Sequence, residues 1–410
     1  MQALIVRKRL EEPTILRFFA GLLIETHLLR PTLPMNLLPR RTFLRKGTAA
    51  ALGTAVAATA ATACSSESTS PAQQSRTDNT IYRWKMVTTW PPNFPILGEG
   101  CQLFADWVEK MSAGRMRIQV YGGGELAPAL EAFDAVSYGA AEMGHGASYY
   151  WAGKIPSASF FTTVPFGMNG SQMTAWLQRG GGLELWRKVY EPFNLIPFMS
   201  GNSGMQMGGW FNKEINSLAD VQGLKMRIPG LGAKVLAKAG GSAVLSAAGE
   251  IFTNLERGVI DASEWIGPYH DHRMGFQKVA KYYYYPGWHE PGSIFELFAN
   301  KSKFESLPDD LQEIIRAGTR WFHVWATTEF DAKNAETLQR MIEEEGVQLR
   351  AFPQEVLDAF RRYTQEVLDE LTASDPTSRE VYASYQKFQR QMAVWSGVSE
   401  KMYYEKLETR

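Results

Sequence analysis

Cysteine is scarce in this sequence. The 410 residues include only Cys64 and Cys101, whereas small exported domains that depend on disulfide bonds carry several paired cysteines. Cys64 stands at a predicted cleavage site, described below, so Cys101 is left without a partner. The sequence therefore excludes a disulfide framework, and we expect Cys101 to be a small core residue.

An excess of charge is also lacking. Forty-three Lys and Arg residues are balanced by 43 Asp and Glu residues. Proteins that bind nucleic acids or anionic membranes electrostatically carry a basic excess, so neither is expected as a partner. The sequence shows no segment typical of a transmembrane span and no heptad run long enough for a coiled coil.

The familiar enzyme motifs are missing as well. The sequence has no Gly-x-Ser-x-Gly elbow, no Cys/His metal spacing, no Walker loop and no dinucleotide fingerprint. Each of these motifs places a nucleophile, a metal or a phosphate in a defined local structure. Their absence argues against the enzyme classes that depend on them.

The N-terminal segment has the composition of an export signal. The pair Arg40–Arg41 lies in a basic stretch that is followed by an uncharged, Ala/Thr-rich run from Ala49 to Ala63. This pattern is typical of a Tat signal, so residues 1–63 are predicted to direct the folded protein to the periplasm. Because Met35 lies just upstream of the arginine pair, residues 1–34 are interpreted as an overextended start.

The predicted cleavage site leaves two alternatives open. Ala61-Thr62-Ala63 fits ordinary signal peptidase, while Cys64 followed by two serines resembles a lipoprotein junction. Secreted and lipid-anchored forms, the latter held through Cys64, both remain consistent with the sequence. Residues 64–80 are mostly Ser, Thr, Gln, Asn and Pro, which predicts a disordered tether.

The rest of the chain is too long for one compact core and alternates strand and helix patterns. We expect lobe 1 mainly within 81–205, lobe 2 mainly within 206–300, and a helical region over 301–410. Alternation of strands and helices argues for parallel α/β sheets. The predicted strands are 81–90, 116–121, 141–146, 195–200, 206–211 and 224–229; the predicted helices between them are 97–111, 128–138 and 231–239.

Beyond Leu307 the pattern predicts long helices over 308–345, 353–371 and 379–406. Such helices can brace two lobes or form a dimer arm, and packing on their own domain is an equal alternative. An apolar face for a second copy would use aromatic residues of the last helix: Tyr382, Tyr385, Phe388, Trp395 and Tyr403.

Two charged residues end predicted strands. Glu264 follows a short buried strand, and open α/β sheets place ligands at the carboxyl ends of their strands. Arg227 ends the strand in Lys225-Met-Arg-Ile-Pro-Gly230, and an arginine fork can hold a carboxylate through two parallel hydrogen bonds. Taken alone, such an arginine is more often part of a surface ion pair.

These two segments resemble a known family. Lys225–Gly230 and Gly249–Tyr269 are similar to the DctP-type extracytoplasmic receptors of TRAP transporters, and the run that begins Glu264-Trp265 resembles the branch that binds small 2-oxo and 2-hydroxy acids. The resemblance implies a two-lobed periplasmic-binding-protein α/β fold with long lobe-spanning and C-terminal helices. It also implies TRAP membrane subunits as partners and a homodimer.

The resemblance further implies a site. Arg227 would hold the substrate carboxylate, and a sodium or calcium ion would bridge substrate and protein. Carboxylate, amide and carbonyl oxygens suit such hard ions. The implied metal ligands are Gln206, Glu264 and the carbonyl of Trp265, with Glu290 and His289 as alternates; the implied substrate contacts are Gln206, Trp90, Tyr150 and Asn202, with Trp265 as a further wall residue.

One alternative belongs to another functional class. A Tat-exported, metal-assisted hydrolase or sugar-active enzyme would use Glu264 and Glu290 as acid and base.

Two residues depart from the family pattern: Leu255 stands where many relatives have Gln, and His270 where Asn is familiar.

Overall fold

The computed structural model describes residues 80–407. The chain divides into two units, Met1–Gln74 and Ser75–Arg410, and all described residues belong to the second. The predicted Tat signal, the cleavage site with Cys64 and nearly all of the predicted tether lie outside the described residues. Within 80–407 no helix has the length and apolar character needed to cross a bilayer.

Lobe 1 is built on a five-stranded sheet with the order β2-β1-β3-β10-β4. The first three strands are parallel, and β10 runs antiparallel to both of its neighbours. The carboxyl ends of β1, β3 and β4 therefore lie at the same edge as the start of β10. The strands are β1 (Tyr82–Thr88), β2 (Met116–Tyr121), β3 (Met143–Gly146), β4 (Leu195–Asn202) and β10 (Ile294–Asn300).

Lobe 2 is built on a six-stranded sheet with the order β11-β9-β5-β8-β6-β7. Strands β6, β7 and β8 are parallel, whereas β5 is antiparallel to β8 and β9. Both sheets are mainly parallel, as predicted, but in each sheet one strand, β10 or β5, runs against its neighbours. The strands are β5 (Gly209–Phe211), β6 (Lys225–Arg227), β7 (Ser242–Val244), β8 (Ala262–Ser263), β9 (Tyr282–Tyr285) and β11 (Gln348–Ala351).

The two sheets draw on chain segments that interleave in the sequence. Strand β10 lies within 206–300 but belongs to the sheet of lobe 1, and β11 lies within the segment predicted to be helical but completes the sheet of lobe 2. The chain thus passes between the sheets after β4, after β9 and again before β11. The predicted boundaries, 81–205 for lobe 1 and 206–300 for lobe 2, state only where most of each lobe lies, and they stay a prediction.

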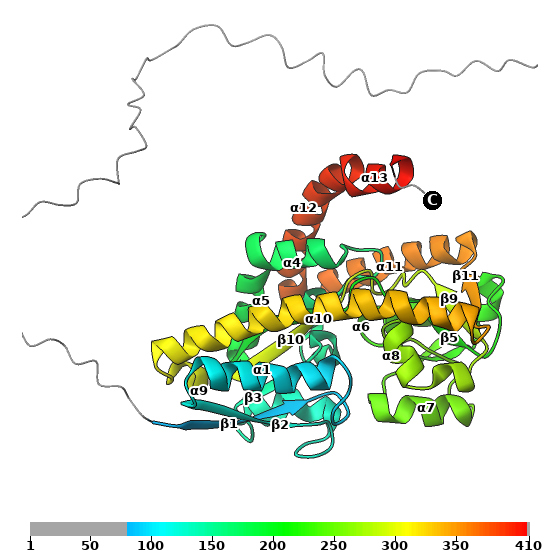
Figure 1. Cartoon of the computed structure of the whole chain (residues 1–410). Helices are drawn as coiled ribbons and strands as arrows, with labels where there is room; N and C mark the ends of the chain where they lie inside the picture. Colours follow the sequence, from blue (N-terminus) through cyan, green and yellow to red (C-terminus); the bar gives the residue numbers. More distant parts are fainter. Residues whose placement is uncertain (1–79, 408–410) are drawn as a thin grey trace, which may run out of the picture. The chain divides into compact units, whose positions relative to one another are not determined.

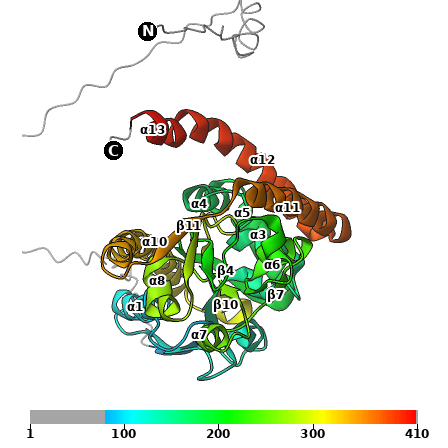
Figure 2. The same cartoon turned by 90° about the vertical axis from the view of Figure 1, so that its right-hand side faces the viewer.

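Helices cover both sheets (Figures 1 and 2). In α1 the residues Leu97, Cys101, Phe104 and Val108 recur every three or four positions and are all buried, so Cys101 is a core residue as expected. The helices of the two lobes are α1 (Leu97–Met111), α2 (Ala132–Ser137), α3 (Ser159–Thr162), α4 (Gly170–Arg179), α5 (Gly182–Tyr190), α6 (Gly230–Lys238), α7 (Ala248–Glu256), α8 (Pro268–Arg273) and α9 (Lys301–Glu305).

Helix α10 (Asp309–Glu343) braces the two lobes. It packs on α1 and β4 of lobe 1 and on α8 of lobe 2, and Figure 1 shows it running past both sheets. Helix α11 (Gln354–Ser374) packs on α6, while α12 (Pro376–Val398) begins on α11 and continues into α13 (Glu400–Lys406). The long-helix prediction after Leu307 is therefore confirmed, with β11 as the strand that it missed.

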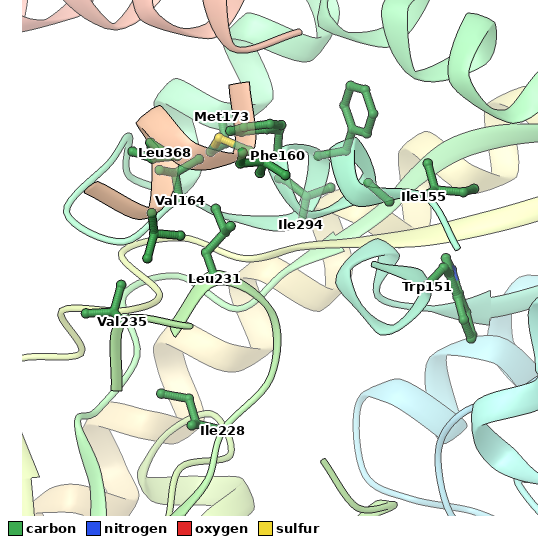
Figure 3. Close-up of a cluster of buried hydrophobic side chains, with 14 of the residues drawn as sticks. Trp151, Ile155, Phe160, Val164, Met173, Ile228, Leu231, Val235, Ile294 and Leu368 are labelled. Atoms are coloured by element: carbon green, nitrogen blue, oxygen red, sulfur yellow. The ribbon is translucent and has the colours of Figure 1, made fainter. Parts of the chain in front are cut away.

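One apolar core joins the two lobes beside α6. Figure 3 shows Leu231 and Val235 of α6 lying near Val164 and Leu368, and all four belong to the same buried cluster. Burying such side chains stabilises the fold by roughly 1.5–3 kcal/mol each. The lobes are thus held together by apolar packing as well as by the connecting strands.

A buried carboxyl group lies within the sheet of lobe 1. Glu296 of β10 accepts hydrogen bonds from Trp151 Nε1 at 2.6 Å and from the Tyr190 hydroxyl at 2.9 Å. Burial raises the pKa of Glu296 from 4.5 to about 8, and the two hydrogen bonds oppose the shift. The folded protein therefore keeps a proton that the unfolded chain releases, so this contribution to stability is complete below pH 4.5 and is lost as the pH rises through about 8.

We expect Glu296→Gln to be more stable than the wild type at pH 9, by on the order of 2 kcal/mol, because the amide keeps a neutral acceptor in place. The difference should shrink at pH 5, where the wild-type carboxyl group is neutral. Urea unfolding at pH 5, 7 and 9 measures it. An equal difference in the free energy of unfolding at pH 5 and pH 9 would contradict this interpretation of Glu296.

Candidate functional site

The candidate site lies where the chain crosses between the lobes. The first crossing, residues 203–208, and the second, residues 286–293, pair through backbone hydrogen bonds: Ser203 N donates to Ser293 O at 3.0 Å, and Gln206 N to Glu290 O at 3.3 Å. Gln206 was predicted to lie in a strand over 206–211, but the strand begins at Gly209. The crossing thus holds Gln206 opposite Glu290.

Three titratable side chains gather at this crossing. Potential ligand atoms of Glu264, His289 and Glu290 all lie within 4.8 Å of one another, and all three residues are buried. Glu264 directly follows β8, whereas His289 and Glu290 come from the second crossing. The structure thus brings the predicted ligand Glu264 together with both alternates, His289 and Glu290, which lie about 25 residues further along the chain.

Gln206 completes the cluster with an amide group. Its Nε2 donates to Glu290 Oε2 at 2.8 Å and to Ser203 Oγ at 3.1 Å, which turns the amide oxygen away from both. Gln206 Oε1 and His289 Nδ1 are buried and have no hydrogen-bond partner. Unsatisfied buried acceptors of this kind are rare in folded proteins and mark a place for a ligand.

The Glu264 carboxylate disfavours the charged form of Glu290. Burial raises the pKa of Glu290 to about 7, and the neighbouring Glu264 carboxylate adds to the shift. A cation placed between such groups would favour the ionised form of both. The donor set of two carboxylates and an amide oxygen therefore fits a hard cation.

Arg227 lies at the end of β6 and is 1% exposed. Its Nη1 pairs with the Glu264 carboxylate and lies 3.4 Å from the Glu264 carbonyl oxygen. Its Nε and Nη2 are buried and have no partner. These two N–H groups form the side-on edge of the guanidinium, the edge that binds a carboxylate through two parallel hydrogen bonds.

Aromatic side chains from both lobes surround this arginine. The Arg227 guanidinium lies 5.1 Å from the centroid of the Trp265 ring, and Tyr150 is close enough to interact electrostatically with Arg227. Trp90 meets Trp265 edge to face at 6.1 Å and Tyr150 at 6.4 Å. The three predicted wall residues are thus brought together, two from lobe 1 and one from lobe 2.

The lobes also touch beside the arginine. Gly230, with φ of +60°, starts α6 of lobe 2, and a Cβ atom there would lie 3.2 Å from Tyr149 of lobe 1. Glycine both tolerates this backbone angle and leaves room for the tyrosine ring. The sequence Lys225–Gly230 therefore supplies the arginine and the close interlobe approach together.

Asn202 is placed differently from the other predicted contacts. Its Oδ1 accepts from Gly204 N at 2.8 Å, and its amide lies against Gly170 of α4. It lines a surface groove with residues of α4 and α10, among them Thr174 and Thr327. Within residues 80–407 its contacts hold the first crossing in shape, and a contact with substrate stays a prediction.

Several residues at the site were not singled out from sequence for this role. Ser203 and Ser293 orient Gln206 and Glu290, and Ser293 Oγ donates to Glu290 Oε2. His145 accepts from Trp90 Nε1 at 2.7 Å. No local motif marks these residues, because their roles arise from pairing between the two crossings and between neighbouring strands.

Comparison with known proteins places this site in context. Residues 86–375 match the DctP family model, described as bacterial extracellular solute-binding protein, family 7. The chain is 41% identical over 357 residues to a monocarboxylate 2-oxoacid-binding periplasmic protein of Nostoc, covering 86% of this chain and 96% of that protein.

Two crystal structures of TRAP periplasmic solute-binding proteins are also similar, each with a TM-score of 0.78 over 80% of this chain. The protein from Colwellia psychrerythraea is 43% identical, has 99% of its length covered, and holds calcium and pyruvate. The protein from Pseudoalteromonas atlantica is 42% identical, has its whole length covered, and holds sodium and pyruvate. These relatives are solute-binding proteins, so the enzyme alternative finds no support among them.

The family match extends over most of the described residues, and the two-lobed α/β architecture agrees with the solved relatives. The chain therefore belongs to the DctP family of bacterial extracellular solute-binding proteins, family 7.

Proposed function

We propose that this protein is the extracytoplasmic receptor of a TRAP transporter and binds a small 2-oxo or 2-hydroxy monocarboxylate together with a sodium or calcium ion. One observation carries the proposal: a buried arginine with two free N–H groups lies beside a buried carboxylate cluster that has a free amide oxygen. An anion and a cation are both needed to satisfy these groups. Relatives that hold pyruvate with calcium or sodium support the same chemistry.

The cation would be held by oxygen atoms of Glu264, Gln206 and Glu290, with the carbonyl of Trp265 as a further candidate. When bound, it offsets the charge of the two carboxylates and attracts the electron-rich oxygens of the substrate. His289 Nε2 lies 3.3 Å from Glu264 Oε2, so this histidine orients Glu264. Sodium and calcium use the same ligand types, which leaves the choice between them to measurement.

Arg227 would hold the substrate carboxylate through Nε and Nη2. Its Nη1 stays on Glu264, which fixes the plane of the guanidinium before the substrate arrives. Trp90, Tyr150 and Trp265 exclude water from the ion pair, which strengthens it. With groups from both lobes around one ligand, binding favours the closed arrangement that membrane subunits would recognise.

A thermal-shift screen tests the proposed function, because a ligand that binds only the folded state raises its melting temperature by mass action. Pyruvate, longer 2-oxo acids, lactate and sugars are tested with calcium, with sodium, and with both ions removed. We expect 2-oxo or 2-hydroxy acids to stabilise the protein only when a cation is present. Stabilisation by sugars, with none by these acids, would contradict the proposal.

The same proposal includes export by the Tat route, with the mature protein either free or anchored through Cys64. Arg40–Arg41 and the small residues before Cys64 support it. Replacing both arginines with lysine should keep the protein in the cytoplasm, and Cys64→Ser should release it from the membrane fraction only if it is lipid-anchored.

We also propose a homodimer formed through the C-terminal helices. Val394, Trp395 and Val398 of α12 are each more than 60% exposed, and α12 projects beyond α11 (Figure 2). Exposed apolar groups of this kind favour contact with another surface.

We expect Trp395→Glu combined with Val398→Glu to convert a dimer into a monomer with unchanged acid binding, because two charges would then have to be buried at the interface. Light scattering measures the mass. Lys234→Glu, a charge change at an exposed position of α6, is the matched control and should leave the mass unchanged. A wild-type protein that is monomeric at working concentration would refute the dimer.

A further inference from the structure

The two tryptophans that face each other across the lobes are each held by a histidine. Trp90 Nε1 donates to His145 Nδ1 at 2.7 Å, and Trp265 Nε1 donates to His270 Nδ1 at 3.4 Å. The indole planes meet at 83°. Each histidine therefore fixes one indole ring, and the ring of Trp265 is the one that lies beside Arg227.

The partners of His270 determine where its proton lies. Its Nε2 lies 2.8 Å from the carbonyl oxygen of Pro95, which can only accept, so Nε2 must carry a hydrogen. Its Nδ1 accepts from Trp265 and must be free of hydrogen. The two hydrogen bonds together therefore require the neutral ring.

The two histidines differ in the partner of their other ring nitrogen, Nε2. His145 lies on β3 and its Nε2 faces Ser200 O of β4 at 3.4 Å, within lobe 1. His270 lies on α8, which follows β8 of lobe 2, yet its partner Pro95 lies in the loop after β1 of lobe 1. The His270–Pro95 hydrogen bond therefore joins the lobes.

The surroundings of His270 come from three parts of the fold. Phe94 of lobe 1 packs edge to face on the imidazole at 4.6 Å, and Phe330 of the brace helix α10 does so at 4.9 Å. The ring is completely buried. In water-free surroundings a hydrogen bond that is broken leaves a costly unsatisfied group, so the His270–Pro95 bond is worth more here than at a surface.

The loop that presents the Pro95 carbonyl is itself held in a strained conformation. Ile96, a buried β-branched residue, has φ of +58°. This region is unfavourable for β-branched residues and persists only where the surroundings enforce it. The hydrogen bond to His270 and the Phe94 contact are two of the interactions that act on this loop.

We propose that His270 is a positioning residue that latches the closed lobes: it fixes the Trp265 indole over Arg227 and ties that orientation to lobe 1 through Pro95. This inference rests on the proposed receptor function. Because this bond joins the two lobes, we expect it to slow the release of the substrate. The stronger bond, at 2.8 Å, is the one across the lobes.

Two substitutions separate the two bonds of His270. Glutamine carries its Nε2 near the position of imidazole Nε2 and can still donate to Pro95, whereas asparagine keeps an acceptor near Nδ1 and loses the bond to Pro95. His270→Phe keeps a ring and loses both bonds. His272→Gln, on the same helix with its ring on Glu345, is the matched control.

Stopped-flow displacement of pyruvate in calcium buffer measures the release rate. We expect His270→Phe and His270→Asn to release pyruvate about tenfold faster, the effect of one hydrogen bond, with little change in the association rate. His270→Gln and His272→Gln should stay within about threefold of the wild type. A purely structural role would instead lower the melting temperature of all three His270 variants, without the difference in release rate between the asparagine and glutamine variants.

Wild-type release rates in His270→Phe and His270→Asn would overturn the latch, as would equal acceleration in the asparagine and glutamine variants. If His270→Phe does not fold, the comparison of asparagine with glutamine decides alone. A wild-type protein that does not bind pyruvate with calcium would refute the proposed function in its pyruvate form and the latch with it. Normal wild-type binding with unaffected variants refutes the latch only.

Discussion

Replacing Arg227 with lysine should weaken the binding of pyruvate more than about 100-fold, which corresponds to roughly 3 kcal/mol. Lysine keeps the positive charge beside Glu264 but cannot offer the two parallel N–H groups that Nε and Nη2 present. Isothermal titration calorimetry in calcium buffer measures the loss. Affinity within a few-fold of the wild type would refute the role of the arginine fork.

Lysine is a sharper test here than alanine. The Arg227–Glu264 ion pair is fully buried, and removing one partner of such a pair typically costs about 3–5 kcal/mol of stability because the other charge stays uncompensated. Arg227→Ala could therefore lose binding by unfolding. Arg350→Lys, a partly exposed arginine of β11, is the matched control and should bind pyruvate normally.

Replacing Glu264 with glutamine should lower the affinity for calcium about 100-fold and remove the cation dependence of pyruvate binding. The substitution keeps the size of the side chain and removes one of the two negative charges that a cation would neutralise. It also leaves Arg227 without its buried partner, so we expect a lower melting temperature without ligand. Calcium titration with the thermal-shift readout separates the two effects.

The control for this second test is Glu296→Gln. Glu296 is an equally buried carboxyl group whose hydrogen bonds go to Trp151 and Tyr190, away from the cluster of Glu264, His289 and Glu290. The Glu296→Gln variant should keep the full response to calcium. A Glu264→Gln variant with the calcium response of the wild type would show that Glu264 is not a ligand.

The parts of the fold that are periodic in sequence are the parts that could be predicted from it. Helix α1 was predicted with its observed bounds, because apolar residues recur at helical spacing; the residues just after its end, Ala113 and Gly114, both have positive φ. Strand β2 was also predicted correctly, from strict alternation. Both signals are local.

Elements defined by distant partners were missed. Strand β9, a run of four tyrosines, and strand β10, which contains Glu296, carry no turn signal that distinguishes them from a loop or a helix. Strand β10 is defined by its pairing with β3 and β4, residues about 100 or more positions away. The reversal of direction in each sheet follows from such pairing and has no signal in sequence.

The candidate site could likewise be predicted only in part from the sequence. Strand-end position made Glu264 and Arg227 candidates, but the family resemblance, not spacing, supplied their roles and singled out Gln206. The resemblance also named Glu290 and His289 as alternates, but their contact with Glu264 depends on the pairing of the second crossing with Gln206 of the first crossing, which only the structure shows. The unpaired atoms of Arg227 and Gln206 become visible only in three dimensions.

A crystal structure of the protein with pyruvate and calcium tests the central claim most directly. We expect the pyruvate carboxylate to accept hydrogen bonds from Arg227 Nε and Nη2, with the ion bound by Glu264 and Gln206 on the side of the keto oxygen. An Arg227 side chain that makes no contact with bound pyruvate, or an ion bound without Glu264, would contradict it.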